Sequence, residues 1–174
     1  MPNYKRFYLK DYNYVFITMV TYNRAPILID NIDLLRQSFK SVLKKYNFRI
    51  FSICILKDHI HMILKMDNLN EFSNIISNLK KYFTYNYHNK PLKESLPKSM
   101  QKRKEAGIWQ RRFYEHIIRN DNDLQKHLDY IHFNPYKHYN ILPSSWKYST
   151  FLKFVNMGYY ELNWCEFNDD LQYE

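Results

Sequence analysis

The sequence predicts an α+β domain, and three observations lead to that prediction. Apolar, β-branched runs alternate with segments of helical period in the order β-α-β-β-α-β-α. The 174 residues have the length of one domain, and a 45 % hydrophobic content can supply its core. With only two glycines, a glycine-rich phosphate loop cannot be assembled. This order of elements predicts a ferredoxin-like split-βαβ sandwich, in which an antiparallel sheet carries helices on one face, with one extra helix and a C-terminal tail.

The first half of the chain is predicted to contain three strands and two helices. The run YVFITMVT is rich in β-branched residues, and FRIFSICIL and HMILKM flank the short KDHI segment as an antiparallel pair. Apolar residues at helical spacing, behind a cap at Asp30 or Asn31, predict the first helix. In chain order the predicted elements cover residues 14–21, 31–46, 48–56, 61–66 and 69–88.

The second half begins with a segment of a different character. Residues 89–107 hold two prolines and many basic residues, which predicts a mobile basic loop. A fourth strand is expected over 113–118, followed by a helix over 121–133 that Pro135 ends. We expect one domain over residues 1–152 and an aromatic tail, 153–174, packed on it.

The charge balance favours a polyanionic partner. Lys and Arg total 26 against 17 Asp and Glu, which gives a net charge of +9. Aromatic residues reach 18 %, and basic charge interleaved with aromatic rings suits unstacked bases. Nucleic acid is the first candidate and an acidic membrane the second, although an AT-rich coding bias would also raise Lys, Asn, Tyr and Ile. Two isolated cysteines, no apolar run of membrane length and no signal-peptide pattern predict a cytoplasmic protein without a membrane span.

The segment KDHIHM carries the sharpest local motif. His59 and His61 are separated by one apolar residue at the start of a predicted strand, so both side chains should project to the same face. Two adjacent imidazoles can bind one divalent cation. For an isolated pair of this kind, two surface or hydrogen-bonded histidines are the more common outcome. A histidine-triad hydrolase is excluded because Ile63 stands where a third alternating histidine is needed.

The helix after Asn120 carries the second motif. Leu124, Leu128 and Ile131 form its apolar stripe, whereas His127, Tyr130 and Asn134 share a different flank. Tyr130 and Asn134 are one turn apart, so a helix docked by its apolar stripe can present a phenol and an amide oxygen together. Taken alone, Tyr130 fits a half-buried packing aromatic better than a nucleophile.

Together these motifs resemble those of the single-tyrosine HUH transposases, especially the REP-associated tyrosine transposases. The resemblance covers about residues 4 to 152, and its segments occur in the same order: YKRFYLK, KDHIHMIL, NLKKYFTYNY, IWQRRFYEHIIR and DLQKHLDYIHFNPYKHYN. The chain departs from that pattern at Lys57, where the family usually has Pro, and in the basic insert around 91–106.

The resemblance implies a metal-dependent DNA nuclease and strand transferase. His59 and His61 would bind Mg²⁺ or Mn²⁺ with Asn134 as third ligand, and Tyr130 would be the nucleophile. Its substrate would be single-stranded DNA beside an imperfect hairpin. His127, one turn before Tyr130, is a candidate proton acceptor, although a contact to a DNA phosphate or plain solvation fits it better. REP-associated members are typically monomers and insertion-sequence relatives are dimers; the aromatic tail favours the monomer.

DNA contacts are expected from basic and aromatic residues outside this site. The candidates are Tyr4, Lys5, Arg6, Lys80, Lys81, Trp109, Arg111 and Arg112. Two other functions stay open at this point. One is a non-catalytic protein of the same fold that binds DNA or RNA hairpins, and the other is a metal-dependent hydrolase that activates water.

Overall fold

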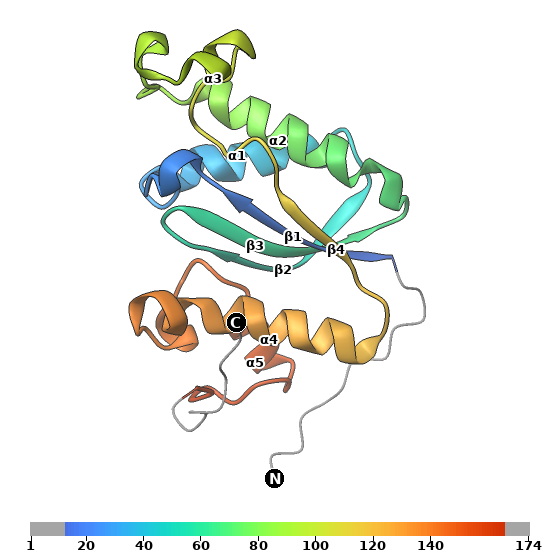
Figure 1. Ribbon diagram of the computed structural model, residues 1–174. Coiled ribbons are helices and arrows are strands. Elements are labelled where there is room, and N and C mark those ends of the chain that lie inside the picture. The colour runs from blue at the N-terminus through green and yellow to red at the C-terminus, as the bar shows by residue number, and fades with distance from the viewer. Residues whose placement is uncertain (1–12, 166–174) are drawn as a thin grey trace.

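The computed structural model describes residues 13–165, and these contain one antiparallel sheet of four strands (Figure 1). The strand order is β2-β3-β1-β4, with every neighbouring pair antiparallel. The strands are β1 (Tyr14–Val20), β2 (Phe48–Ile55), β3 (His59–Met66) and β4 (Tyr114–Ile117). This arrangement confirms the predicted α+β, ferredoxin-like class. It places β3 and β1 in the middle of the sheet and leaves β4 as an edge strand.

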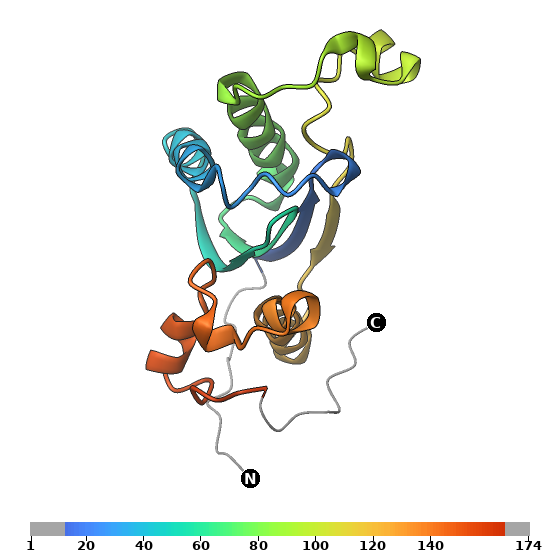
Figure 2. The same cartoon turned by 90° about the vertical axis from the view of Figure 1, so that its left-hand side faces the viewer.

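Helices cover both faces of the sheet (Figures 1 and 2). Helices α1 (Ile32–Leu43) and α2 (Phe72–Asn86) lie side by side on one face, as the split-βαβ order predicts. Helix α4 (Asp121–Tyr139) lies on the opposite face, where it contacts β2 and β3, and α5 (Phe151–Asn156) follows it. The extra helix therefore closes the face of the sheet that α1 and α2 leave open.

The alternation of side chains along the central strands gives the two faces different compositions. On β1, Ile17 and Met19 point into the core under α1 and α2, while Phe16 packs in the cluster under α4. On β3, Ile60 and Met62 belong to the first core. His59 and His61, which alternate with them, therefore occupy the α4 side. One face of the sheet is thus a plain apolar core, whereas the other carries the imidazoles.

Helix α4 does not end before Pro135, and the prediction of a helix over 121–133 is wrong at this end. The helix continues to Tyr139 with Pro135 buried inside it. A proline in a helix removes one main-chain hydrogen bond, but here the flanking turns are held between the sheet and the C-terminal segment. Asn140 caps the C-terminal end of the helix: its left-handed conformation (φ 52°) lets its N–H donate to the carbonyls of Pro135 and Tyr136.

The basic insert is more structured than a loop, so that prediction is also corrected. It contains a 3₁₀ turn, η3 (Lys93–Ser95), and a short helix, α3 (Lys98–Lys102). Leu96 and Met100 are buried and anchor the insert. Gly107 closes it with a φ of +68°, where a Cβ atom would lie 2.5 Å from a methyl carbon of Leu96. Other 3₁₀ turns are η1 (Tyr22–Arg24), η2 (Leu69–Glu71) and η4 (Pro143–Ser145).

An aromatic cluster joins the C-terminal segment to the outer side of α4. It consists of Leu128, Phe133, Phe151, Phe154, Tyr160, Trp164 and Cys165. The division of the chain into a domain and a tail at residue 152 stays a prediction. Within residues 13–165, no helix is long and apolar enough to cross a bilayer.

Acidification is expected to destabilise this fold through His132. The side chain is fully buried, with Nε2 3.1 Å from Thr150 Oγ1 and 3.3 Å from Ser52 Oγ, and burial lowers its pKa to about 3. Below about pH 6.5 the unfolded chain protonates this histidine while the folded chain does not. Through this group, the free energy of unfolding should therefore decrease by about 1.4 kcal/mol for each unit by which the pH falls below about 6.5.

Urea unfolding between pH 7 and pH 4 measures this dependence. The variant His132→Gln cannot titrate and should show a shallower loss of stability with falling pH. Equal slopes in the wild type and the variant would contradict the prediction.

Candidate active site

A cavity of about 570 Å³ lies between the sheet and α4 and holds most of the predicted catalytic residues. It brings together His59 and His61 from β3 with His127 and Tyr130 from α4, as the sequence predicts. The remaining lining residues are Phe16, Thr18, Val20, Arg24, Tyr114, Lys126, Lys137 and His138.

The two histidines of β3 are held in place at one ring nitrogen each. Their ring centroids are 4.9 Å apart. His59 Nδ1 lies 2.6 Å from Asp58 Oδ1, and His61 Nδ1 lies 2.8 Å from Thr18 Oγ1. Partners at Nδ1 orient a histidine so that Nε2 can bind a metal. The Nε2 atom of His61 is buried and has no hydrogen-bond partner within residues 13–165.

The environment keeps both imidazoles neutral, which a metal ligand requires. Burial lowers the pKa of His61 well below its usual value of 6.5, and the neighbouring His59 and His138 lower it further. Burial also lowers the pKa of His59, although the Asp58 carboxylate acts in the opposite direction.

Asn134 offers the third candidate ligand. Its side chain is fully buried, and its Nδ2 donates a hydrogen bond to the main-chain carbonyl of Tyr130. That bond fixes the amide and leaves Oδ1 buried without a partner among the described residues. Two imidazole nitrogens and an amide oxygen form a donor set suited to a small divalent cation such as Mn²⁺ or Mg²⁺. The residues present therefore fit the metal that the resemblance implies.

Tyr130 lies beside this donor set. Its ring centroid is 5.0 Å from that of His61 and 6.0 Å from that of Phe16. The ammonium group of Lys137 lies 5.7 Å from the centre of the Tyr130 ring. Burial raises the pKa of Tyr130, while a hydrogen bond with Asn134 and the charge of Arg24 act in the opposite direction. The phenol is therefore uncharged at neutral pH and needs a proton acceptor to act as a nucleophile.

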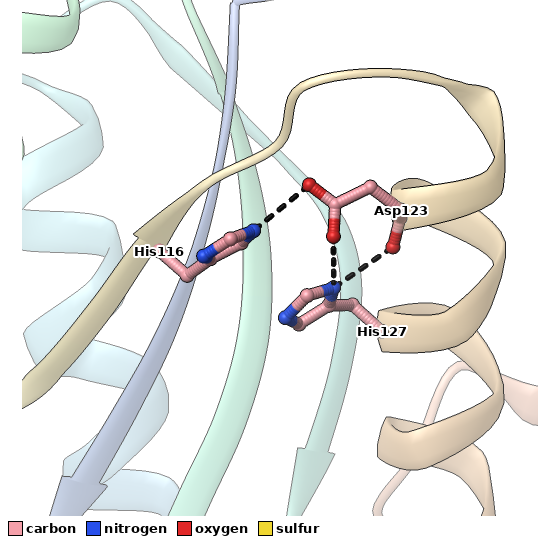
Figure 3. Close-up of side chains that lie close together, drawn as sticks. All are labelled: His116, Asp123 and His127. Carbon is pink, nitrogen blue, oxygen red and sulfur yellow. Dashed lines mark hydrogen bonds and ion pairs between the residues drawn. The ribbon is translucent and has the colours of Figure 1, made fainter.

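A His–Asp–His network joins β4 to the start of α4 (Figure 3). Asp123 joins the two histidines, because His116 Nε2 lies 2.8 Å from its Oδ2 and His127 Nδ1 lies 3.1 Å from its Oδ1. His127 Nδ1 also lies 2.8 Å from the main-chain oxygen of Asp123. Two acceptor oxygens at Nδ1 place the hydrogen there, which leaves His127 Nε2 as an acceptor.

The charge of Asp123 is stabilised within this network. Burial alone would raise its pKa, but hydrogen bonds from His116 and from the main chain of Arg119 lower it below the usual value. An ionised Asp123 therefore orients the imidazole of His127. The ligand atoms of the three side chains lie within 4.8 Å of one another, so they could also hold a metal ion.

Three further residues of the cavity were missed by the sequence analysis. His138 lies with its ring centroid 4.8 Å from that of His59. Lys137 precedes it, and Arg24 pairs with Asp58 at 3.0 Å. Lys137 and His138 follow Tyr130 by about two helical turns. This spacing places them on the same side of the helix as Tyr130 only if the helix continues through Pro135, as it does here.

The predicted DNA-contacting residues are not gathered at Tyr130. Tyr4, Lys5 and Arg6 lie outside the described residues. Lys80, Lys81, Trp109 and Arg111 line a second hollow on the α1–α2 side of the sheet, and Arg112 follows them as an exposed residue. Burial lowers the pKa of Lys80 to about 8, and its Nζ donates to the carbonyl of Gln110 at 2.9 Å.

Comparison with known proteins decides the family. The family described as "Transposase IS200 like" matches residues 8–134. The chain belongs to the IS200-like transposase family. Its residues 59–61 and Tyr130 fall inside the matched range, as do His116, Asp123 and His127.

Relatives of this IS200-like transposase match nearly the whole chain. The REP-associated tyrosine transposase of Escherichia coli K12 is 32 % identical over 167 residues, covering 95 % of this chain and 92 % of the relative. A Haemophilus influenzae protein assigned to the same group is 38 % identical over 166 residues, covering 94 % and 93 %. The solved structure of a REP-associated tyrosine transposase bound to a REP hairpin matches with a TM-score of 0.71 and 31 % identity, covering 94 % and 91 %.

Proposed function

We propose that this IS200-like transposase is a single-strand DNA endonuclease and strand transferase with Tyr130 as its nucleophile. One observation carries the proposal: the phenol of Tyr130 and the imidazoles of His59 and His61 share one cavity, with the Tyr130 and His61 rings 5.0 Å apart. A packing aromatic would not require two fixed, neutral histidines beside it.

The proposed step exchanges one phosphodiester for another. The Tyr130 oxygen attacks the phosphorus of a single DNA strand, forms a P–O bond and releases the 3′ oxygen of the preceding nucleotide. The products are a 5′-phosphotyrosine and a 3′-OH end. Because the linkage retains a phosphodiester, a second 3′-OH can attack it and join strands without ATP.

Different residues of the site have different proposed roles in this step. When bound by His59, His61 and Asn134, a divalent cation would supply Lewis-acid polarisation of the phosphate. Arg24, Lys126 and Lys137 line the same cavity and favour a phosphate there by charge. His127 accepts the phenolic proton at Nε2, and Asp123 stabilises the resulting imidazolium through Nδ1.

The partner proposed for the site is DNA that forms a hairpin. The net charge of +9 favours a nucleic acid, and the solved relative with 31 % identity is bound to a REP hairpin. Tyr130, His59 and His61 of the same chain line one cavity, so a single copy can carry the site, and a monomer is proposed as the active unit.

Trapping the covalent intermediate tests the proposal. The chain is incubated with Mn²⁺ and labelled hairpin oligonucleotides that carry randomised single-stranded flanks, and the products are separated on a denaturing gel. We expect a protein–DNA adduct and a shorter strand with a free 3′-OH. Binding without cleavage would instead identify a non-catalytic hairpin-binding protein, and cleavage without an adduct would identify a hydrolase.

Replacing His127 by Gln is expected to slow adduct formation about a hundredfold, because it removes the proton acceptor of Tyr130. Binding of the uncleaved hairpin should stay unchanged, as measured by fluorescence anisotropy. Asp123→Asn should slow the same step by a smaller factor. Asp33→Asn, which removes an exposed carboxylate of α1, is the matched control. Weaker DNA binding at an unchanged cleavage rate would assign His127 to a phosphate contact instead.

A further inference from the structure

A second hollow lies on the opposite side of the sheet from Tyr130. It has a volume of about 1050 Å³ and is bounded by the C-terminal part of α1, the outer side of α2 and residues 104–113. The mechanism proposed for Tyr130 does not use this hollow, here called the α2 groove.

Among the charged side chains that line the α2 groove, six are basic and one is acidic. Its single acidic residue, Glu105, already pairs with Arg103 at 2.6 Å. Lys45, Lys81, Lys104 and Arg111 are exposed. The basic lining residues are Lys45, Lys80, Lys81, Lys90, Lys104 and Arg111. Such a groove favours a ligand with repeated negative charges.

Aromatic rings are interleaved with these charges. Tyr85 is 83 % exposed and carries Lys90 beside it, with Lys90 Nζ 6.0 Å from the ring centre. Tyr82, Trp109 and Phe113 line the same groove. Trp109 is buried, yet its indole N–H has no hydrogen-bond partner within residues 13–165. An exposed ring between cations, as at Tyr85, is a feature that binds unpaired bases and their backbone.

The α2 groove and the catalytic cavity are lined by neighbouring residues at the edge strand β4. Phe113 lines the groove, and the next residue, Tyr114, lines the cavity. At the end of β1, the main-chain N–H of Gln110, a residue of the groove, donates a hydrogen bond to the carbonyl of Val20 at 2.9 Å. Val20 itself lines the cavity. Because β4 is the edge strand, a single strand that leaves Tyr130 around this edge of the sheet would reach the groove.

We propose that the α2 groove binds the single-stranded DNA flank that continues from the scissile phosphate. The inference rests on the proposed function, since it takes the DNA in the cavity as its starting point. Backbone phosphates lie along Lys45, Lys90 and Lys104, and a base stacks on Tyr85. Part of the groove wall, residues 104–107, comes from the basic insert, which gives this insert a role in substrate binding.

The test compares two substrates and two triple variants. One substrate is a hairpin with single-stranded flanks of about 15 nucleotides, and the other has flanks trimmed to the immediate surroundings of the cleavage position. The groove variant is Lys45→Gln with Lys90→Gln and Lys104→Gln. The control variant, Lys65→Gln with Lys147→Gln and Lys153→Gln, removes three exposed charges that line neither hollow.

Fluorescence anisotropy over a series of salt concentrations gives the readout. For the long substrate, the groove variant should bind about tenfold or more weakly, and the magnitude of its salt slope should fall by about two, because each phosphate contact to a single strand contributes about 0.7. The control variant should retain the wild-type slope. On the trimmed substrate all three proteins should bind alike. Tyr85→Ala should weaken binding of the long substrate about tenfold through lost stacking.

Two results would overturn the proposal. One is equal affinity of the groove and control variants for the long substrate. The other is an equal loss of affinity by the groove variant for the trimmed substrate, which would show that the groove binds the hairpin and not the long flank. Failure of wild-type protein to form an adduct would refute the cleavage function alone, because the anisotropy comparison does not depend on cleavage.

Discussion

Replacement of Tyr130 by Phe is expected to abolish adduct formation, with a loss of at least about a thousandfold in the cleavage rate. The substitution removes only the phenolic oxygen and keeps the ring that packs against His61 and Phe16. Hairpin binding and thermal stability should therefore stay close to those of the wild type. Denaturing gels of single-turnover reactions measure the rate.

Tyr136→Phe is the matched control, because Tyr136 lies on the same helix and packs against Phe133 outside the cavity. It should cleave as the wild type does. If Tyr130→Phe still cut the strand without forming an adduct, a water-activating hydrolase would replace the proposed mechanism.

Removal of divalent cations is the second change with a large expected effect. EDTA should reduce cleavage at least about a hundredfold, since the phosphate loses the cation that would polarise it, and added Mn²⁺ should restore it. His61→Ala should produce the same loss without restoration. Calorimetric titration with Mn²⁺ provides a second readout, in which His61→Ala should bind the ion much more weakly than the wild type.

His88→Ala serves as the control for this variant, because His88 is an exposed histidine that does not line the cavity. Thermal unfolding shows whether His61→Ala is still folded. Cleavage that persists in EDTA at the full rate would rule out the metal site assigned to His59, His61 and Asn134. Metal-dependent cleavage that survives in His61→Ala would instead indicate that the metal is bound by His116, Asp123 and His127.

The sequence was sufficient to predict the sheet and the residues of β3 because both follow from period-two alternation. Ile60 points into the core, so His59 and His61 must share the other face. The position of Tyr130 was also predictable, since Leu124 and Ile131 of the predicted stripe pack against the sheet, whereas Leu128 packs against the C-terminal segment.

The remaining features depend on tertiary packing, which local patterns do not contain. A proline usually ends a helix. Helix α4 nevertheless continues past Pro135, because the residues around it are buried on two sides. The same packing brings His138 beside His59. The spacing of Asp123 and His127 by one helical turn is compatible with their contact, but nothing in the sequence indicates that His116 of the preceding strand meets Asp123.

The placement of His59 and His61 on an interior strand has an evolutionary consequence. A shift of one residue in the pairing of β3 would exchange the ligands with Ile60 and Met62 and bury both imidazoles in hydrocarbon. We therefore expect an insertion or deletion of one residue within β3 to disrupt both the proposed metal site and the folding of the sheet. By contrast, the segment between α2 and β4 lies outside the paired strands, so a change in its length need not alter strand alignment.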